Sequence, residues 1–282
     1  MGGTYIKGYI DFKNEKKEDL ISSVKIESDI KNSGMFNRSK SNDSLKIGRI
    51  SNDSGGYIAA NSQIFENIPN TSISRKILKE SIKGTPIIKF GSSSPKVMII
   101  AGIHGNELSP QIAAIKLIHK LEKLEKEDKI SGTIYIIPFS SPKSTMDNSR
   151  WFNGVDLNRI TSVKGSITNE ILSKIKEFNL NSIGDFHSTS INSMPGKEGI
   201  FCTMKPSPES FQIAKYISDS TKSELLFYKN AGNAYKGALE DECNIALIPA
   251  VTCEVLSPNG IAKKEAWERS LDRWSIIYPI LE

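Results

Sequence analysis

One stretch of the chain, Lys96 to Leu108 (KVMIIAGIHGNEL), constrains the fold more than any other. Its four consecutive apolar residues, 97–100, predict a buried strand, and the Ala-Gly pair that follows predicts a tight turn. From Leu108 onward apolar residues recur every three or four positions, which is the pattern of an amphipathic helix. This order indicates an α/β sheet, in which ligands bind beyond the carboxyl ends of strands. His104 and Glu107 therefore lie where chemistry is expected.

Strand-like and helix-like segments alternate through the rest of the chain. Strands are expected at 5–12, 24–30, 44–50, 87–90, 132–138, 183–186, 199–204 and 245–255, and helices at 73–82, 169–178, 207–221 and 266–281. This alternation predicts an α/β fold with a mixed, largely parallel twisted sheet and helices on both faces. Residues 1–72, rich in Asn, Ser and Lys, are expected to form an N-terminal extension or a small strand-rich region, and 73–282 the main domain.

The composition narrows the class of protein. The chain has 282 residues, of which 38% are hydrophobic and 24% charged, values typical of a soluble globular protein. It contains no apolar run as long as a membrane span, and its N-terminus lacks the apolar core of a signal peptide. We therefore expect no membrane partner and, by default, a cytoplasmic location, with association with a cell wall as the alternative.

The net charge of +5 is unevenly distributed along the chain. Residues 1–90 carry 15 basic and 10 acidic side chains, whereas residues 91–282 carry 22 of each. The surplus is mild and lacks the dense Lys/Arg run of a nucleic-acid-binding protein, so a solvated surface is expected and a nucleic-acid partner is not. The three cysteines form no CxxC pair and are interpreted as reduced, structural residues.

The residue types on the turn at 102–107 point to a metal ion. His104 and Glu107 form an HxxE pair, and a turn can bring an imidazole and a carboxylate onto one ion. A catalytic zinc takes three protein ligands and leaves one position open, so a further ligand is expected elsewhere. His187 is the candidate, because His119, the remaining histidine, falls among lysines late in the helix. Asp185 is interpreted as lying on the side of its strand opposite to His187, in a structural or supporting role.

A long polar loop, 140–160, follows the strand at 132–138. Loops of this size inside a compact domain are usually functional or disordered. Arg150 lies in it, and Asn158 precedes Arg159, a pair that can clamp an anionic group because a guanidinium binds a carboxylate through two parallel hydrogen bonds. The alternative is two surface arginines in a loop.

Two further residues carry potential chemistry. Tyr235 lies in the glycine-punctuated segment 231–241, where it can reach a substrate or simply pack. Glu254 is the single carboxylate of the apolar segment 245–255. Burial of a carboxylate raises its pKa towards neutrality, which suits a general base acting on water.

Taken together, the motifs resemble those of the zinc carboxypeptidase superfamily (the M14 group), and most closely its succinylglutamate desuccinylase/aspartoacylase branch. The matching motifs occur in the expected order: GIHGNE at 102–107, VDLNR at 155–159, DFHSTS at 185–190 and a late glutamate in TCEV at 252–255. The resemblance covers residues 85–282 and leaves the first third of the chain without a counterpart.

This resemblance implies a zinc-carboxypeptidase-like fold and a zinc hydrolase domain over 73–282. It implies that one zinc ion is held by three ligands: His104, Glu107 and His187. It further implies that Glu254 activates water for attack on an amide carbonyl and that Arg150 stabilises the oxyanion. Asn158 and Arg159 match the pair that holds the substrate's carboxylate. Tyr235 matches the peptidase tyrosine only approximately in its spacing from Glu254.

The function expected first is that of a zinc-dependent deacylase, which hydrolyses an amide bond next to a carboxylate-bearing group. The segment after Glu254, VLSPNG, departs from the aspartoacylase sequence, which leaves the substrate open. The alternative is a metallocarboxypeptidase or peptidase acting on cell-wall peptides of the pseudomurein type. An alternative of another class is a non-catalytic module that binds a wall or another polymer.

Overall fold

The computed structural model describes residues 46–277 and, within them, one eight-stranded sheet. Its strands are β1 (Lys46–Arg49), β2 (Pro86–Gly91), β3 (Lys96–Ala101), β4 (Thr133–Ile137), β5 (Ser182–Thr189), β6 (Gly199–Lys205), β7 (Leu225–Asn230) and β8 (Ala250–Leu256). They lie in the order β1-β2-β4-β3-β5-β8-β6-β7. The central strands β4, β3, β5 and β8 run parallel, while β1, β2 and the β6–β8 pairing are antiparallel. The expected mixed, largely parallel sheet is confirmed.

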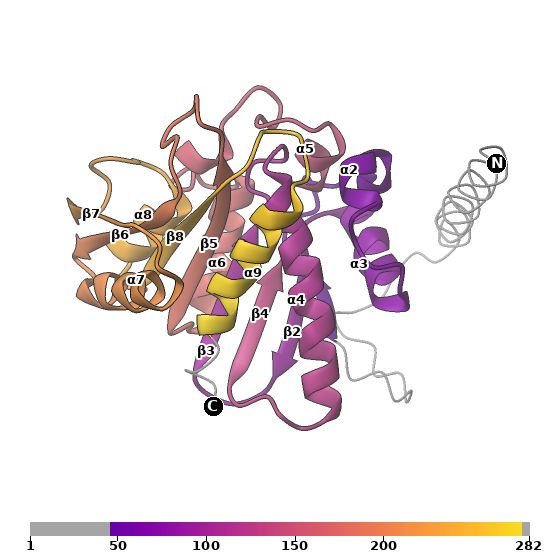
Figure 1. The fold of residues 1–282 in the computed structure, drawn as a ribbon, viewed down its shortest axis with the longest axis horizontal. Helices are drawn as coiled ribbons and strands as arrows, with labels where there is room; N and C mark the ends of the chain where they lie inside the picture. Colours follow the sequence, from indigo (N-terminus) through magenta and orange to yellow (C-terminus); the bar gives the residue numbers. More distant parts are fainter. Residues whose placement is uncertain (1–45, 278–282) are drawn as a thin grey trace, which may run out of the picture. The chain divides into compact units, whose positions relative to one another are not determined.

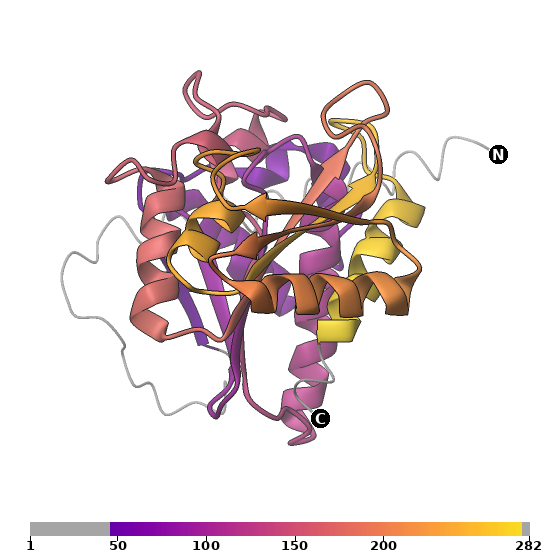
Figure 2. The same cartoon turned by 90° about the vertical axis from the view of Figure 1, so that its left-hand side faces the viewer.

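Helices cover both faces of this sheet (Figures 1 and 2). The helical segments are η2 (Ile58–Ala60), α2 (Ser62–Phe65), α3 (Ser72–Lys83), α4 (Leu108–Lys126), α5 (Pro142–Met146), η3 (Leu157–Arg159), α6 (Ile167–Phe178), α7 (Pro208–Thr221), α8 (Leu239–Ile245) and α9 (Lys264–Ile277). Helices α4 and α9 pack side by side on one face, and α6 packs with α8 on the other. Within the described range, no helix combines the length and apolarity that crossing a membrane takes.

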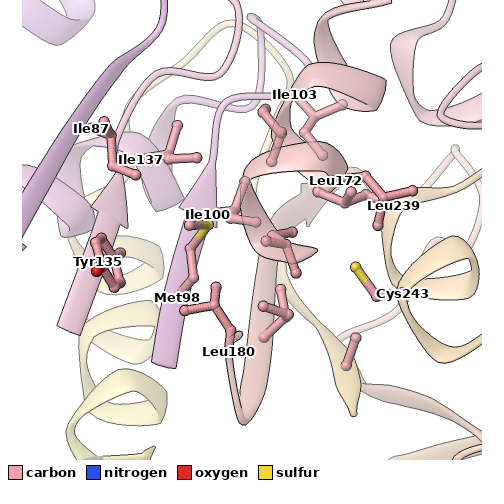
Figure 3. Close-up of a cluster of buried hydrophobic side chains, with 14 of the residues drawn as sticks. Ile87, Met98, Ile100, Ile103, Tyr135, Ile137, Leu172, Leu180, Leu239 and Cys243 are labelled. Atoms are coloured by element: carbon pink, nitrogen blue, oxygen red, sulfur yellow. The ribbon is translucent and has the colours of Figure 1, made fainter. Parts of the chain in front are cut away.

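The position of β3 in the sheet explains why residues 97–100 form a continuous apolar run. Successive side chains of a strand point to opposite faces, and both faces are covered here by helices. Met98 and Ile100 lie in the core beneath α6 and α8, together with Leu172, Leu239 and Cys243 (Figure 3). Ile99, between them, is buried on the α4 side, so positions 97–101 leave no place for a polar side chain and only Lys96, at the start of the strand, is polar.

Some expected elements differ in the structure. The apolar segment 245–255 is not one strand, because α8 ends at Ile245 and β8 begins only at Ala250, after Pro249. Residues 246–249 form the connection between them, and Pro249 lacks the N–H group that a strand ladder needs. The polar loop 140–160 contains the short segments α5 and η3. The strands expected at 5–12 and 24–30 lie outside the described residues.

The residues just before the predicted boundary at residue 72 pack against the same sheet. β1 pairs with β2 in an antiparallel ladder, and α2 packs against α4. The side-chain amide of Asn61 donates to the carbonyl oxygen of Thr145 at 2.7 Å, which joins this segment to α5. The division of the chain at residue 72 stays a prediction.

Candidate metal centre and active site

The site lies at the carboxyl ends of three neighbouring parallel strands, β3, β5 and β8. β3 leads directly into the turn that carries His104 and Glu107, and β5 carries His187. β8 carries Glu254, which is the register partner of His187. Four residues from three separate motifs are therefore brought to one edge of the sheet, where ligands bind in α/β folds.

His104, Glu107 and His187 form a buried group that could hold a metal ion. The Nδ1 atom of His104 lies 2.7 Å from Oε1 of Glu107, and Nδ1 of His187 lies 2.8 Å from its Oε2. The two rings are 5.0 Å apart between centroids. Two imidazole nitrogens and a carboxylate are the donor set that a catalytic zinc takes from protein. The residues present therefore fit this metal.

Two aspartates hold the other nitrogen of each ring. Oδ1 of Asp156 lies 2.9 Å from Nε2 of His104, and Oδ2 of Asp185 lies 3.0 Å from Nε2 of His187. Carboxylates in this position fix the orientation of a metal-binding imidazole and raise its basicity. The interpretation of Asp185 as lying opposite to His187 was wrong, because residues two apart on a strand share a face. Asp156 was given no role in the sequence analysis, although it lies in the VDLNR motif.

Charge is concentrated on this group. Burial by itself would raise the pKa of Glu107, but the charges and hydrogen bonds of His104 and His187 outweigh it and hold that pKa well below its ordinary value. Burial would lower the pKa of His187, yet the charges of Asp185 and Glu107 raise it well above its usual range. The carboxylate of Glu107 is thus ionised and ready to bind a cation.

The turn at 102–107 is braced from two sides. The side-chain amide nitrogen of Gln111 donates to the carbonyl oxygens of His104, Gly105 and Glu107, at distances of 2.9 to 3.3 Å. Gly105 packs so closely on α5 that a Cβ atom there would meet backbone atoms of Ser144 at 2.0 Å. The sequence HGNE therefore needs glycine at this position, and the brace holds both candidate ligands in place.

Arg150 lies beside the candidate ligands. Its NH1 lies 3.3 Å from Oε1 of Glu107 and 3.3 Å from Nδ1 of His104, and its NH2 donates to Asp156 at 2.9 Å. Burial opposes ionisation of Asp156, but the hydrogen bond with His104 and the charge of Arg150 lower its pKa. A guanidinium held in this way presents a fixed positive charge next to the metal-binding group.

Glu254 is half-buried and faces the same pocket. Burial, followed by the negative charge of Glu107, raises its pKa to about 8. Its Oε2 atom is inaccessible to solvent and has no hydrogen-bond partner among the described residues. An unpartnered carboxylate oxygen is costly to bury, and such groups concentrate at functional sites.

The Asn-Arg pair and Tyr235 meet on another wall of the pocket. Oδ1 of Asn158 accepts from the backbone N–H of Leu239 at 2.9 Å, and its Nδ2 lies 3.5 Å from Nε2 of His187. The guanidinium of Arg159 lies over the ring of Tyr235, with its Cζ 5.6 Å from the ring centroid. Gly237 contacts the backbone of Arg159 so closely that a Cβ there would meet its carbonyl oxygen at 2.2 Å.

One pocket collects all eight candidate residues, and its empty volume is about 560 Å³, open solvent at its mouth included. Its further lining comes from residues that the sequence analysis did not single out, among them Met194, Phe201, Tyr228, Glu240 and Thr252. They lie in β6, β7, α8, β8 and the loop before β6, and no local motif marks them.

The remaining histidine and the cysteines lie away from this group. Nε2 of His119 lies 2.9 Å from the hydroxyl oxygen of Ser74, so the ring joins α4 to α3. All three cysteines are free and buried. Burial raises the pKa of Cys253 to about 12, which agrees with its interpretation as a structural residue.

Solved structures with this fold include deacylase-family proteins, a carboxypeptidase and an amidase. An aspartoacylase family protein from Mesorhizobium loti is 20% identical, with a TM-score of 0.51 over 70% of this chain and 61% of its own. A metallo-carboxypeptidase from Burkholderia cenocepacia is 15% identical, with a TM-score of 0.53 over 70% of this chain and 60% of its own. The murein-tripeptide amidase from Escherichia coli O157 is 16% identical, with a TM-score of 0.50 over 70% of this chain and 87% of its own.

The comparison with models of protein families identifies one family. The chain spans 61% and 58% of the lengths of two deacylase-family structures, from Mesorhizobium loti and Rhodobacter sphaeroides. No curated protein sequence matches it. The model of the succinylglutamate desuccinylase/aspartoacylase catalytic domain matches residues 93–255, a range that begins just before β3 and ends just after Glu254. The chain belongs to the succinylglutamate desuccinylase/aspartoacylase family.

Proposed function

We propose that this protein is a zinc-dependent hydrolase that cleaves an amide bond next to a carboxylate-bearing group. The observation that carries the proposal is the buried group of His104, Glu107 and His187, with the unpartnered oxygen of Glu254 in the same pocket. Bound there, zinc supplies a Lewis acid that lowers the pKa of water and polarises a carbonyl group.

The side chains around this group divide the remaining work. Glu254 takes a proton from the attacking water and passes it to the leaving amine, a role for which a pKa of about 8 suits it near neutral pH. Arg150 donates to the carbonyl oxygen as negative charge develops on it. Arg159 binds the substrate's carboxylate, and the amide of Asn158 adds a donor beside it.

The openness of the pocket favours a peptide substrate as the second candidate. Met194 lines the pocket yet is 83% exposed, so the pocket is open to solvent on that side. Glu240 also lines it and is only 4% exposed. Burial, followed by the negative charge of Asp241, raises the pKa of Glu240 well above its ordinary value, so this wall presents a neutral carboxyl group.

The test is a comparison of substrate classes on zinc-loaded protein. Acyl-amino acids, such as a succinylated or acetylated dicarboxylic amino acid, are assayed beside short peptides with and without a basic residue. Cell-wall fragments form the third class of substrate. We expect the protein to bind one zinc ion per chain. We also expect it to turn over at least one of these substrates, and this activity to disappear in Glu254→Gln.

The non-catalytic alternative predicts a different outcome. Zinc-loaded protein that binds wall material tightly and cleaves no member of these classes would contradict the hydrolase.

A further inference from the structure

The last residues of β8 are held by a strand on one side only. On the β5 side, Val255 and Leu256 pair with Ser188 and Thr189. On the other side, the pairing with β6 stops at Glu254, the partner of Gly199. The backbone groups beyond that point need partners, since an unpaired buried N–H or C=O is costly.

Side chains take the place of the missing strand. The backbone N–H of Leu256 donates to Oε2 of Glu198 at 3.1 Å, and NH2 of Arg269 donates to the carbonyl oxygen of Leu256 at 3.2 Å. The Nε atom of Arg269 lies 3.0 Å from both carboxylate oxygens of Glu198. Helix α9 is thereby tied to the end of β8.

Arg273 extends this arrangement to the residue proposed as the base. The side chain is 2% exposed, and its NH1 donates to the carbonyl oxygen of Glu254 at 2.7 Å. Its NH2 donates to Glu198, and the hydroxyl oxygen of Ser223 accepts from the same group at 2.9 Å. The Nε atom also donates to the hydroxyl oxygen of Ser223 at 3.2 Å, so each of the three guanidinium nitrogens has a partner and the group has a fixed orientation.

A buried guanidinium is expensive unless its geometry is fully satisfied, and stability alone is a weak reason to keep one. Here it donates to the backbone of Glu254, whose buried Oε2 atom has no hydrogen-bond partner among the described residues. With no hydrogen bond to fix that oxygen, the position of the Glu254 carboxylate depends on its backbone. A displacement of about 1 Å at a reacting group can cost a hundredfold in rate.

We propose that Arg273 is a positioning residue, which holds the backbone of Glu254 so that its carboxylate faces the metal-binding group. This inference rests on the proposed function of Glu254. It assigns to α9, a helix outside the pocket, a share in the geometry of the site.

The experiment is a double-mutant cycle between Arg273 and Glu254 on zinc-loaded protein. Arg273→Gln is expected to lower kcat by about 10- to 100-fold with KM within about twofold. In the Glu254→Gln background the same change is expected to lower the residual kcat by less than about twofold, because the carboxylate that the backbone contact positions is absent there. Arg269→Gln, which touches Leu256 and Glu198 but not Glu254, is the matched control and should keep kcat within about threefold.

An Arg273 effect of equal size in both backgrounds would overturn the inference, since the residue would then act on general stability. Arg273→Lys keeps a buried cation and is used if the glutamine variant does not fold. Its crystal structure gives a readout without substrate, in which the Glu254 carboxylate should shift by about 1 Å relative to His187. An unmoved carboxylate overturns the inference whatever the activity, whereas wild-type protein that cleaves no amide overturns the proposed function alone.

Discussion

Glu254 and His187 are register partners on the adjacent parallel strands β8 and β5. Neighbouring strands lie about 4.8 Å apart, so the sheet itself sets the distance between the proposed base and a proposed metal ligand. His187 in turn contacts Glu107 and Asp185. The base, the metal-binding group and its supporting aspartate therefore form one rigid unit built on the sheet.

Replacing Glu254 by glutamine should abolish hydrolysis and leave metal binding intact. The amide is nearly isosteric but does not take up a proton, and general base catalysis contributes about 10²- to 10⁴-fold. We expect kcat to fall by at least about 10²-fold while zinc content stays at one ion per chain, measured by elemental analysis. Full activity in this variant would rule out the assigned base.

Replacing Asp185 or Asp156 by asparagine should weaken metal binding. Each aspartate holds the outer nitrogen of one histidine, and loss of such partners lowers metal affinity by about 10- to 100-fold. Competition with a chromophoric chelator measures this. Asp147→Asn is the control, because Asp147 lies in an exposed pair with Lys143, 3.5 Å away. Equal zinc affinity in all three variants would contradict the supporting role of the two carboxylates.

Arg159→Lys should raise KM and spare kcat. Lysine keeps the positive charge but loses the planar fork that binds a carboxylate through two hydrogen bonds. We expect KM to rise about tenfold and kcat to change by less than about threefold, in steady-state assays with the best substrate found. Arg75→Lys, at an exposed arginine that contacts Asn70, should change neither constant. A fall in kcat alone would place Arg159 in the chemical step instead.

The stability of the fold should depend on pH through Glu198. Burial by itself would raise the pKa of Glu198, but the hydrogen bond from Arg269 and the charge of Arg273 hold it below its ordinary value of 4.5. The folded pKa is the lower one, so this stabilisation is complete above the ordinary pKa and is lost as the pH falls through the folded pKa.

Urea unfolding of wild-type protein and Glu198→Gln, at several values between about pH 6 and about pH 3, measures this contribution. The difference in free energy of unfolding between the two proteins should narrow as the pH falls. A gap that stays constant over this range would mean that the carboxylate's charge contributes nothing.

The sequence alone determined the elements with strong local signals. The apolar run at 97–100, the turn after it and the period of the following helix are local properties, and each is present in the structure. The parallel α/β class follows from the alternation of such segments. The candidate ligands were recognisable because HxxE and the later motifs keep the residue types that the family's chemistry requires.

The tertiary structure decided which distant residues touch. The contacts of Asp156 with His104 and of Arg273 with Glu254 join segments that no periodic pattern relates. The same holds for Glu240, which enters the pocket from α8, a helix that the sequence analysis did not predict. The spacing of apolar side chains along the sequence and the residues typical of turns indicate only the local conformation of the backbone. Strand order and register, which arise only when the sheet assembles, place these side chains around one site.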